Sequence, residues 1–225
     1  AGHLNDSIAA SHKDLTKVKR MKVTGTINAH DFIMMRDSMP KLTALNLKDV
    51  RIKVPTSGYI HPHWKDDEIP ADCFNGKKSL TSIVFPDVLK GIESGAFAGS
   101  GLKHSLNIPE GVVEIGRGAF AGSDFTGVLT LPSTLKKIDD YAFNGCCFIC
   151  PLNLPDEIEE IGWGCFEDCR NLYGNLILPS HLKNMDRCAF RGCTGLKGDL
   201  VIPKSLTVIP SCAFYNCKFE GRLQL

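Results

Sequence analysis

The chain has 225 residues, 43% of them hydrophobic, which is enough for a substantial buried core and argues against disorder. Its 26 basic and 25 acidic side chains nearly cancel, so no overall field attracts nucleic acid or an anionic membrane. The sequence has no run of about 20 apolar residues, the length of a membrane span, and no N-terminal signal-peptide pattern. We therefore expect no nucleic-acid partner and no membrane insertion by this chain.

Residues 1–57 do not follow the repeat that fills the rest of the chain, and they are predicted to form an N-terminal cap. Residues 21–25 (MKVTG) are predicted to form a strand, and residues 42–52 (LTALNLKDVRI) have the leucine spacing of a first coil. One helix is predicted from Asn5 or Asp6 through Val18. A second is predicted from Asn28 to Pro40. A cap of this kind covers apolar edges that would otherwise face water.

An irregular loop at 53–68 is predicted to join the cap to the repeats. Its metal-ligand side chains are His61, His63, Asp66, Asp67 and Glu68. Ligand types at close spacing are weak evidence for a site when no supporting shell of partners is known. A solvated loop is therefore the favoured interpretation, and no metal site is predicted.

An internal repeat of 23 or 24 residues fills residues 58–225, in about seven copies. Prolines recur at Pro86, Pro109, Pro132, Pro155, Pro179 and Pro203. Phenylalanines recur at Phe74, Phe97, Phe120, Phe143, Phe166, Phe190 and Phe214. An apolar, any, apolar triplet precedes each proline, and further apolar residues follow it at the third and sixth places.

Apolar side chains that recur once per repeat cannot be buried within one unit, so neighbouring repeats must stack as a solenoid and share a core. The triplets are predicted to form short parallel strands along one side, each ended by its proline, which has no N–H to donate. The second apolar pair is predicted to begin another short strand or a turn. The phenylalanine rings are predicted to form an internal column with edge-to-face contacts. Positive φ angles are predicted for Gly99, Gly122, Gly145 and Gly192.

Five segments share one pattern: IPEGVVEIGRGAFAGS, LPSTLKKIDDYAFNGC, LPDEIEEIGWGCFEDC, LPSHLKNMDRCAFRGC and IPKSLTVIPSCAFYNC. They resemble the BspA-like leucine-rich repeat of bacterial surface proteins, and the resemblance extends from Ile69 to Leu225. It implies an α/β solenoid, a right-handed leucine-rich-repeat superhelix with short parallel strands, irregular or short helical convex segments and a small α/β N-terminal cap. It also implies a cell-surface protein that binds host or matrix proteins and carries no catalytic residues.

Most of the ten cysteines occupy repeated positions. Cys146, Cys169, Cys193 and Cys217 lie three places after the phenylalanine, and Cys73, Cys165, Cys188 and Cys212 lie one or two places before it. Small side chains at a repeated inner position suit a stacked core, so buried free thiols are expected and a metal site is not. Cys147 and Cys150 lie outside these columns and are the best candidates for a disulfide.

The remaining motifs favour structure over chemistry. The seven histidines occupy no repeated position, and no phosphate-binding glycine loop is present, so no catalytic residue and no cofactor is expected. Lys136-Lys137 and Glu159-Glu160 occupy equivalent places in neighbouring repeats, with Lys183 one repeat later. We expect these opposite charges to form an exposed ladder worth little per pair.

Non-core residues that align from coil to coil are the candidate binding surface. They are Asn107, Thr130, Asn153, Ile177 and Val201 in one row, and Asn175 and Asp199 in a parallel row. A small, mixed polar and apolar surface suits a protein or a glycan, whereas nucleic acid requires rows of lysine and arginine. Tyr141 and Trp163 are candidate exposed aromatic anchors, with partial packing against adjacent coils as the alternative.

The sequence therefore predicts a non-enzymatic extracellular or cell-surface module for recognition or adhesion that binds a protein partner. The alternatives are a carbohydrate-binding accessory and a structural spacer of a larger surface lipoprotein, with a lipid anchor outside this chain. The period predicts another proline after Leu225. We thus expect either a longer natural chain or end-to-end association through the last coil, because a bare strand edge invites pairing.

Overall fold

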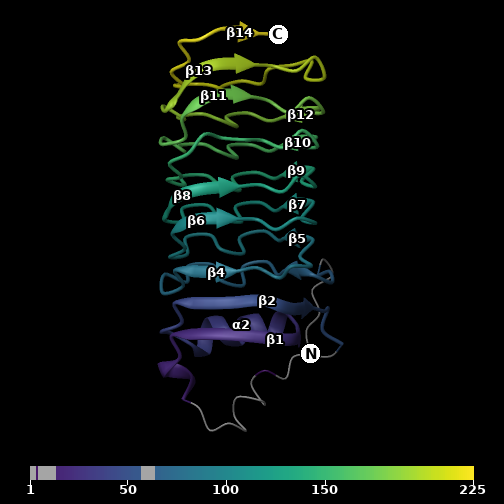
Figure 1. Ribbon diagram of the computed structural model, residues 1–225, viewed down its shortest axis with the longest axis vertical. Coiled ribbons are helices and arrows are strands. Elements are labelled where there is room, and N and C mark those ends of the chain that lie inside the picture. Colours follow the sequence, from purple (N-terminus) through teal and green to yellow (C-terminus); the bar gives the residue numbers. More distant parts are fainter. Residues whose placement is uncertain (1–3, 5–13, 57–63) are drawn as a thin grey trace.

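The computed structural model describes residues 4, 14–56 and 64–225, and in these ranges the chain winds as a stack of coils (Figure 1). The helices are η1 (Leu15–Lys17), which is a 3-10 helix, and α2 (Ala29–Ser38). The strands are β1 (Arg20–Ile27), β2 (Ala44–Ile52), β3 (Glu68–Ile69), β4 (Ser82–Val84), β5 (Gly91–Ile92), β6 (His104–Asn107), β7 (Glu114–Ile115), β8 (Phe125–Thr130), β9 (Lys137–Ile138), β10 (Glu160–Ile161), β11 (Gly174–Ile177), β12 (Asn184–Met185), β13 (Leu196–Val201) and β14 (Leu223–Gln224). All paired strands are parallel, so the predicted solenoid is confirmed.

The N-terminal elements partly match the prediction. The strand expected at 21–25 is β1, and the coil expected at 42–52 contains β2, which pairs with β1. Helix α2 begins after Asn28 as predicted, because Asn28 and Asp31 form a reciprocal capping box. The first predicted helix is wrong at its described end: Asp14 caps a single 3-10 turn, and Val18 is already extended. Its predicted start lies outside the described residues.

The second apolar pair of each repeat forms a continuous sheet, here called the back sheet. Its six strands lie in the order β12-β10-β9-β7-β5-β3 (Figure 1). Each strand buries one apolar side chain, namely Ile69, Ile92, Ile115, Ile138, Ile161 or Met185. This regular pairing holds the coils at the spacing of a parallel sheet, about 4.8 Å, along the back.

The strands before the prolines align on the opposite side, here called the front face, but they do not form one sheet. They divide into β1-β2-β4, β6-β8 and β11-β13-β14. The break between β8 and β11 lies at Pro151, which stands where the preceding coil has Val128 and makes only an isolated parallel bridge with Tyr173. The coils stay joined there by other atoms: the Cys150 sulfur accepts a hydrogen bond from the Leu129 N–H at 3.5 Å.

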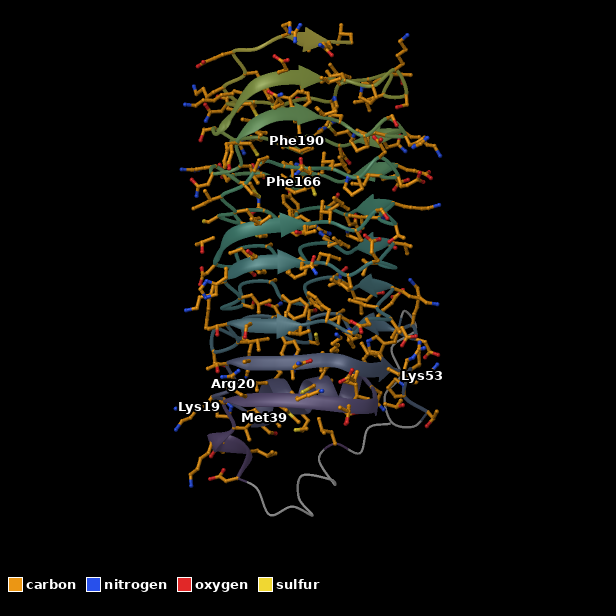
Figure 2. All side chains as sticks on the ribbon, viewed as in Figure 1. Lys19, Arg20, Met39, Lys53, Phe166 and Phe190 are labelled. Atoms are coloured by element: carbon orange, nitrogen blue, oxygen red, sulfur yellow. The ribbon has the colours of Figure 1, made fainter. Side chains whose placement is uncertain are left out.

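The repeated phenylalanines form an unbroken internal column. The six successive pairs from Phe74 to Phe214 have centroid separations of 5.3–5.9 Å and interplanar angles of 3–22°. Figure 2 shows Phe166 and Phe190 one above the other within the stack. The predicted edge-to-face contacts between coils are wrong, because each coil repeats the same backbone turn and therefore keeps its ring nearly parallel to the next. Phe32 of α2 extends the column at the N-terminal end, 5.9 Å from Phe74.

The cysteine column is a hydrogen-bonding column as well as a packing one. The thiols of Cys146, Cys169, Cys193 and Cys217 donate to the carbonyl of the repeated phenylalanine in the preceding coil, at 3.0–3.2 Å. Ser123 makes the same bond to the Phe97 carbonyl at 2.9 Å. Burial raises the pKa of Cys146 and Cys169 above the usual range of a thiol. The column therefore consists of inert donors that satisfy core carbonyl groups.

All ten cysteines lie in the described ranges and are free, including Cys147 and Cys150. The expectation that the thiols are buried is wrong for some of them. Cys147 and Cys212 are exposed, and Cys188 and Cys217 are half-buried. Cys188 and Cys212 have positive φ angles of 59° and 60°, in a turn position that leaves the side chain near the surface. The predicted positive φ of Gly99, Gly122, Gly145 and Gly192 is confirmed.

Lys77 joins the cap to the repeats. It occupies the column position that later coils fill with serine or cysteine, and it is only 8% exposed. Its ammonium donates to the Arg36 carbonyl at 2.6 Å and to the Met39 carbonyl at 2.7 Å, at the C-terminal end of α2. A cation at this end satisfies carbonyl groups that have no partner within the helix and complements the helix dipole.

Candidate functional site

The sequence-predicted rows lie on the front face. Strand pairing places Asn107 beside Thr130, and Ile177 beside Val201, which in turn lies beside Gln224. Asn107, Thr130, Asn153 and Ile177 are exposed, and Val201 is half-buried. The same register continues into the cap, where Lys22 pairs with Asn46 and Asn46 with Val84. The row is thus longer than the sequence indicated.

Asn175 and Asp199, in the second row, link neighbouring coils by hydrogen bonds. The Asn175 side-chain oxygen accepts the Asp199 N–H at 2.9 Å, and the Asp199 carboxylate accepts the Arg222 N–H at 2.7 Å. Ser105 does the same for the Val128 N–H at 3.1 Å. These side chains bridge one coil to the next, so part of their hydrogen-bonding capacity is already used before any partner binds.

Tyr141 and Trp163 do not belong to the front face. They lie in the turns that directly follow β9 and β10 of the back sheet. Their ring centroids are 5.5 Å apart at an angle of 42°, and Trp163 is 45% exposed. The Tyr141 ring covers Gly164 of the next coil, where a Cβ atom would lie 2.7 Å from the ring. The nine sequence-predicted residues therefore form two separate surfaces.

The structure adds two hollows on the front face that the sequence analysis missed. One, of about 410 Å³, lies between β4 and β6, and the other, of about 320 Å³, lies over β1, β2 and β4. The hollows share Ser82 and Val84, so they are contiguous. The sequence contained one sign of this region. The triplet Ile83-Val84-Phe85 precedes Pro86 just as the triplets of the predicted row precede their prolines.

An acidic hollow of about 210 Å³ lies over the back sheet. Its carboxylates are Glu68, Glu93, Glu114 and Asp139, around the side-chain-free positions Gly91 and Gly116. Partial burial and a hydrogen bond with Glu93 raise the pKa of Glu68 to about 7, although Lys65 opposes the shift. Within the described residues no group of three or more histidine, cysteine or carboxylate side chains has an arrangement that could hold a metal ion.

Two carboxylates of the predicted 53–68 loop serve the fold. Asp66 pairs with Lys53 at 2.6 Å, and Asp67 pairs with Arg51 at 2.9 Å while accepting the Ile52 N–H. These contacts join Asp66 and Asp67 to the end of β2 and the residue that follows it. His61 and His63, the other members of the candidate cluster, lie outside the described residues.

The predicted charge ladder is confirmed in one of its pairs. Lys183 contacts Glu159 at 2.6 Å, one coil apart. Lys137 and Glu160 are register partners, but the Lys137 ammonium instead contacts Glu114 of the preceding coil at 3.3 Å.

None of the helices in the described ranges has the length and hydrophobicity that crossing a bilayer requires.

Comparison with a known structure shows the same fold. A leucine-rich repeat protein from Bacteroides ovatus is 23% identical, with a TM-score of 0.52 over 92% of this chain and 49% of that chain. This chain therefore spans about half the length of that protein. A leucine rich cell surface protein from Faecalibacterium prausnitzii is 18% identical, with a TM-score of 0.43 over 92% of this chain and 83% of that one. No curated protein matches the chain significantly.

The repeat itself identifies the family. The BspA type leucine rich repeat region matches residues 67–197 and 173–221, in six copies. The match covers the continuous back sheet, the phenylalanine column and the front strands from β4 to β13. The chain belongs to the BspA-type leucine-rich repeat family.

Proposed function

We propose that this chain is a non-enzymatic recognition module that binds a protein partner through its front face. The observation that carries the proposal is the row of mostly exposed side chains from Lys22 to Gln224, at equivalent positions of successive coils beside two contiguous hollows. An aligned row on a rigid stack presents many contacts with little loss of conformational entropy on binding. Its small polar and apolar side chains suit a protein surface.

The test is binding to purified host matrix proteins immobilised on a surface-plasmon-resonance chip. We expect Thr130→Arg and Ile177→Arg to weaken binding, because each places a bulky charge on the exposed front face. Thr207→Arg is the matched control, since Thr207 is exposed in the segment between β13 and β14 that is not part of the front strands. Equal effects of Thr130→Arg and Thr207→Arg would contradict the proposal.

A carbohydrate-binding role is the second candidate, and the Tyr141–Trp163 pair, in which Trp163 is exposed, favours it. An aromatic pair that is half open to water can stack against the apolar face of a sugar ring. A glycan array distinguishes the candidates. Glycan binding that is lost in Trp163→Ala and kept in Thr130→Arg would support the carbohydrate role, whereas a silent array would remove it.

The extracellular or cell-surface location is also a proposal, and it rests on the family resemblance. Free cysteines are common in reducing compartments and less so outside the cell, which makes the location worth testing directly. Protease treatment of intact cells that express the natural protein should remove it if it is surface-exposed. Full protection until the cells are lysed would contradict this location.

A further inference from the structure

The two front-face sheets β1-β2-β4 and β6-β8 are separated by an open gap. β4 and β6 are consecutive front strands, yet they do not pair, and Figure 1 shows them farther apart than β6 and β8. The back strands of the same coils, β3, β5 and β7, pair regularly. The Lys103 N–H donates to the Thr81 carbonyl at 3.3 Å directly before the two strands, so the coils are spread only from Ser82 and His104 onward, where the 410 Å³ hollow lies.

Unpaired backbone lines this gap on both sides. In the described part of the chain no backbone hydrogen bond joins β4 to β6. The equivalent residues of other coils do bond: Ile108 donates to the Thr130 carbonyl at 3.0 Å, and Leu178 donates to the Val201 carbonyl at 3.1 Å. Two facing strand edges with free donors and acceptors form a template for an added strand.

The gap differs from the other break in the front face. Between β8 and β11 the coils are tied by the Cys150 sulfur and by the Tyr173 N–H, which donates to the Cys150 carbonyl at 3.1 Å. At the β4–β6 gap the nearest such tie in the described residues, from the Lys103 N–H to the Thr81 carbonyl, lies before the strands, and a larger side chain lies inside. Phe85 stands where other coils have isoleucine or leucine, and its ring packs edge-on against Phe97 at 5.8 Å. A bulkier interior residue at this position is a physical reason for the spread.

The side chains around the gap specify the occupant. Its walls are apolar, from Ile83, Phe85, Leu102, Leu106 and Phe125. Its rim is basic: Lys48 and Lys103 line it together with His104. Arg20 and Lys22 line the contiguous hollow, where Lys22 is paired with Asp49 at 2.8 Å. Asp87 is the single carboxylate among the residues that line the two hollows.

We infer that the gap between β4 and β6 binds an extended peptide segment with alternating apolar and acidic side chains, which adds a strand to the front face. The inference rests on the proposed function and specifies the part of the partner that is recognised. Alternating side chains of an extended segment point to opposite sides. Apolar residues then enter the hollow, carboxylates meet the lysines, and the backbone pairs with a free strand edge of the gap.

The test uses a fluorescein-labelled peptide of sequence Val-Asp-Val-Asp-Val and measures fluorescence anisotropy at low ionic strength. We expect Lys103→Glu to weaken binding by roughly tenfold, because it replaces an attraction with a repulsion. Lys197→Glu is the matched control and should leave binding unchanged. Lys197 is also exposed and occupies the equivalent repeat position, six residues before its proline, in β13 of a continuously paired sheet.

Two altered peptides test the mode of binding. A peptide with alternate N-methylated amides lacks donors for strand pairing and should not bind, and a peptide with lysine in place of aspartate should not bind either. Amide hydrogen exchange should slow in β4 and β6 when the first peptide is added. Binding of the N-methylated peptide, unchanged exchange, or equal effects of Lys103→Glu and Lys197→Glu would overturn the inference.

Other results separate this inference from the proposed function. Slower exchange of the same amides at higher protein concentration, without peptide, would assign the gap to a second copy of the chain and overturn the inference. If Thr130→Arg weakens binding to the matrix protein but Lys103→Glu does not, the inference fails and the proposed function stands. If the peptide binds as expected while no front-face variant affects a protein partner, the peptide site stands and the proposed function fails.

Discussion

At the scale of single residues, Glu68 is the side chain whose ionisation opposes the fold. Its carboxyl group lies over Gly91 of the next coil, faces Glu93, and shares the acidic hollow with Glu114. The Lys65 ammonium offsets the repulsion between these carboxylates only in part, with contacts of 3.5 Å to Glu68 and 4.0 Å to Glu93. Desolvation and the neighbouring carboxylate both favour the protonated form.

This environment predicts a pH dependence of stability. The pKa of Glu68 is about 7 in the folded chain and 4.5 in the ordinary case, so the folded state binds more protons between these values. The stabilising contribution is complete below pH 4.5 and is lost as the pH rises through about 7. Because the site is partly open to solvent, we expect Glu68→Gln to raise the free energy of unfolding by only about 1 kcal/mol at pH 8.

Urea unfolding at several pH values checks this prediction. Glu68→Gln should flatten the dependence of the unfolding free energy on pH between 5 and 8, whereas Glu220→Gln, at an exposed position, should not. Parallel pH profiles of wild type and Glu68→Gln would show that Glu68 is not the group responsible.

At the scale of elements, a recurring hydrogen bond joins neighbouring coils. A side-chain oxygen of one coil accepts the backbone N–H of the residue that follows a glycine in the next coil. Asp140 accepts the Trp163 N–H at 2.8 Å, just as Asn175 and Asp199 accept the N–H groups of the following coil on the front face. In each case a glycine precedes the donor residue. A Cβ atom at that glycine would collide with the accepting side chain, as at Gly162 before Trp163.

The contact predicts that Gly162→Ala destabilises the stack. The new methyl group would meet the Asp140 backbone nitrogen and lie 2.6 Å from the Asp139 carbonyl carbon, and neither backbone atom can move without separating the coils. We expect a loss of about 1–3 kcal/mol in the free energy of unfolding, the range for overpacking. Tryptophan fluorescence during urea unfolding measures it, since Trp163 is the next residue. Glu160→Ala, at an exposed position of β10, is the control, and an equal loss there would contradict the explanation.

At the scale of the whole molecule, stability depends on contacts between nearest neighbours along the stack. Each phenylalanine ring of the column touches the rings of the coils before and after it, and the core cluster extends without interruption from the cap to the last coils. In such a one-dimensional array a defect in the middle separates two halves, whereas a defect at an end affects only that end.

Phe143→Ala tests this arrangement. Phe143 is fully buried between Phe120 and Phe166, so its truncation should cost about 3–5 kcal/mol. We also expect chemical unfolding to separate into two transitions, because the halves lose their shared contact. Phe214→Ala in the last coil, where the ring is half-buried, should cost less and keep one transition. A single transition with equal losses in both variants would contradict nearest-neighbour coupling.

The sequence by itself determined the stack. Its period placed the phenylalanine column, the strands before each proline and the second row of strands, because a residue that recurs once per coil has no burial site except against its own equivalents. The capping residue Asn28 likewise fixed the start of α2. The family follows from the same repeated positions.

Only the tertiary structure decided how complete the front face is and where it opens. Pro151 stands at the break between β8 and β11, and Phe85 lies at the gap between β4 and β6, but the repeat period is the same whether neighbouring strands pair or not. The tertiary structure also decided that Tyr141 and Trp163 lie together beside the back sheet and not in the front row. A periodic sequence specifies which residues align along the stack, whereas the shape of each side depends on how every side chain packs against the coil beside it.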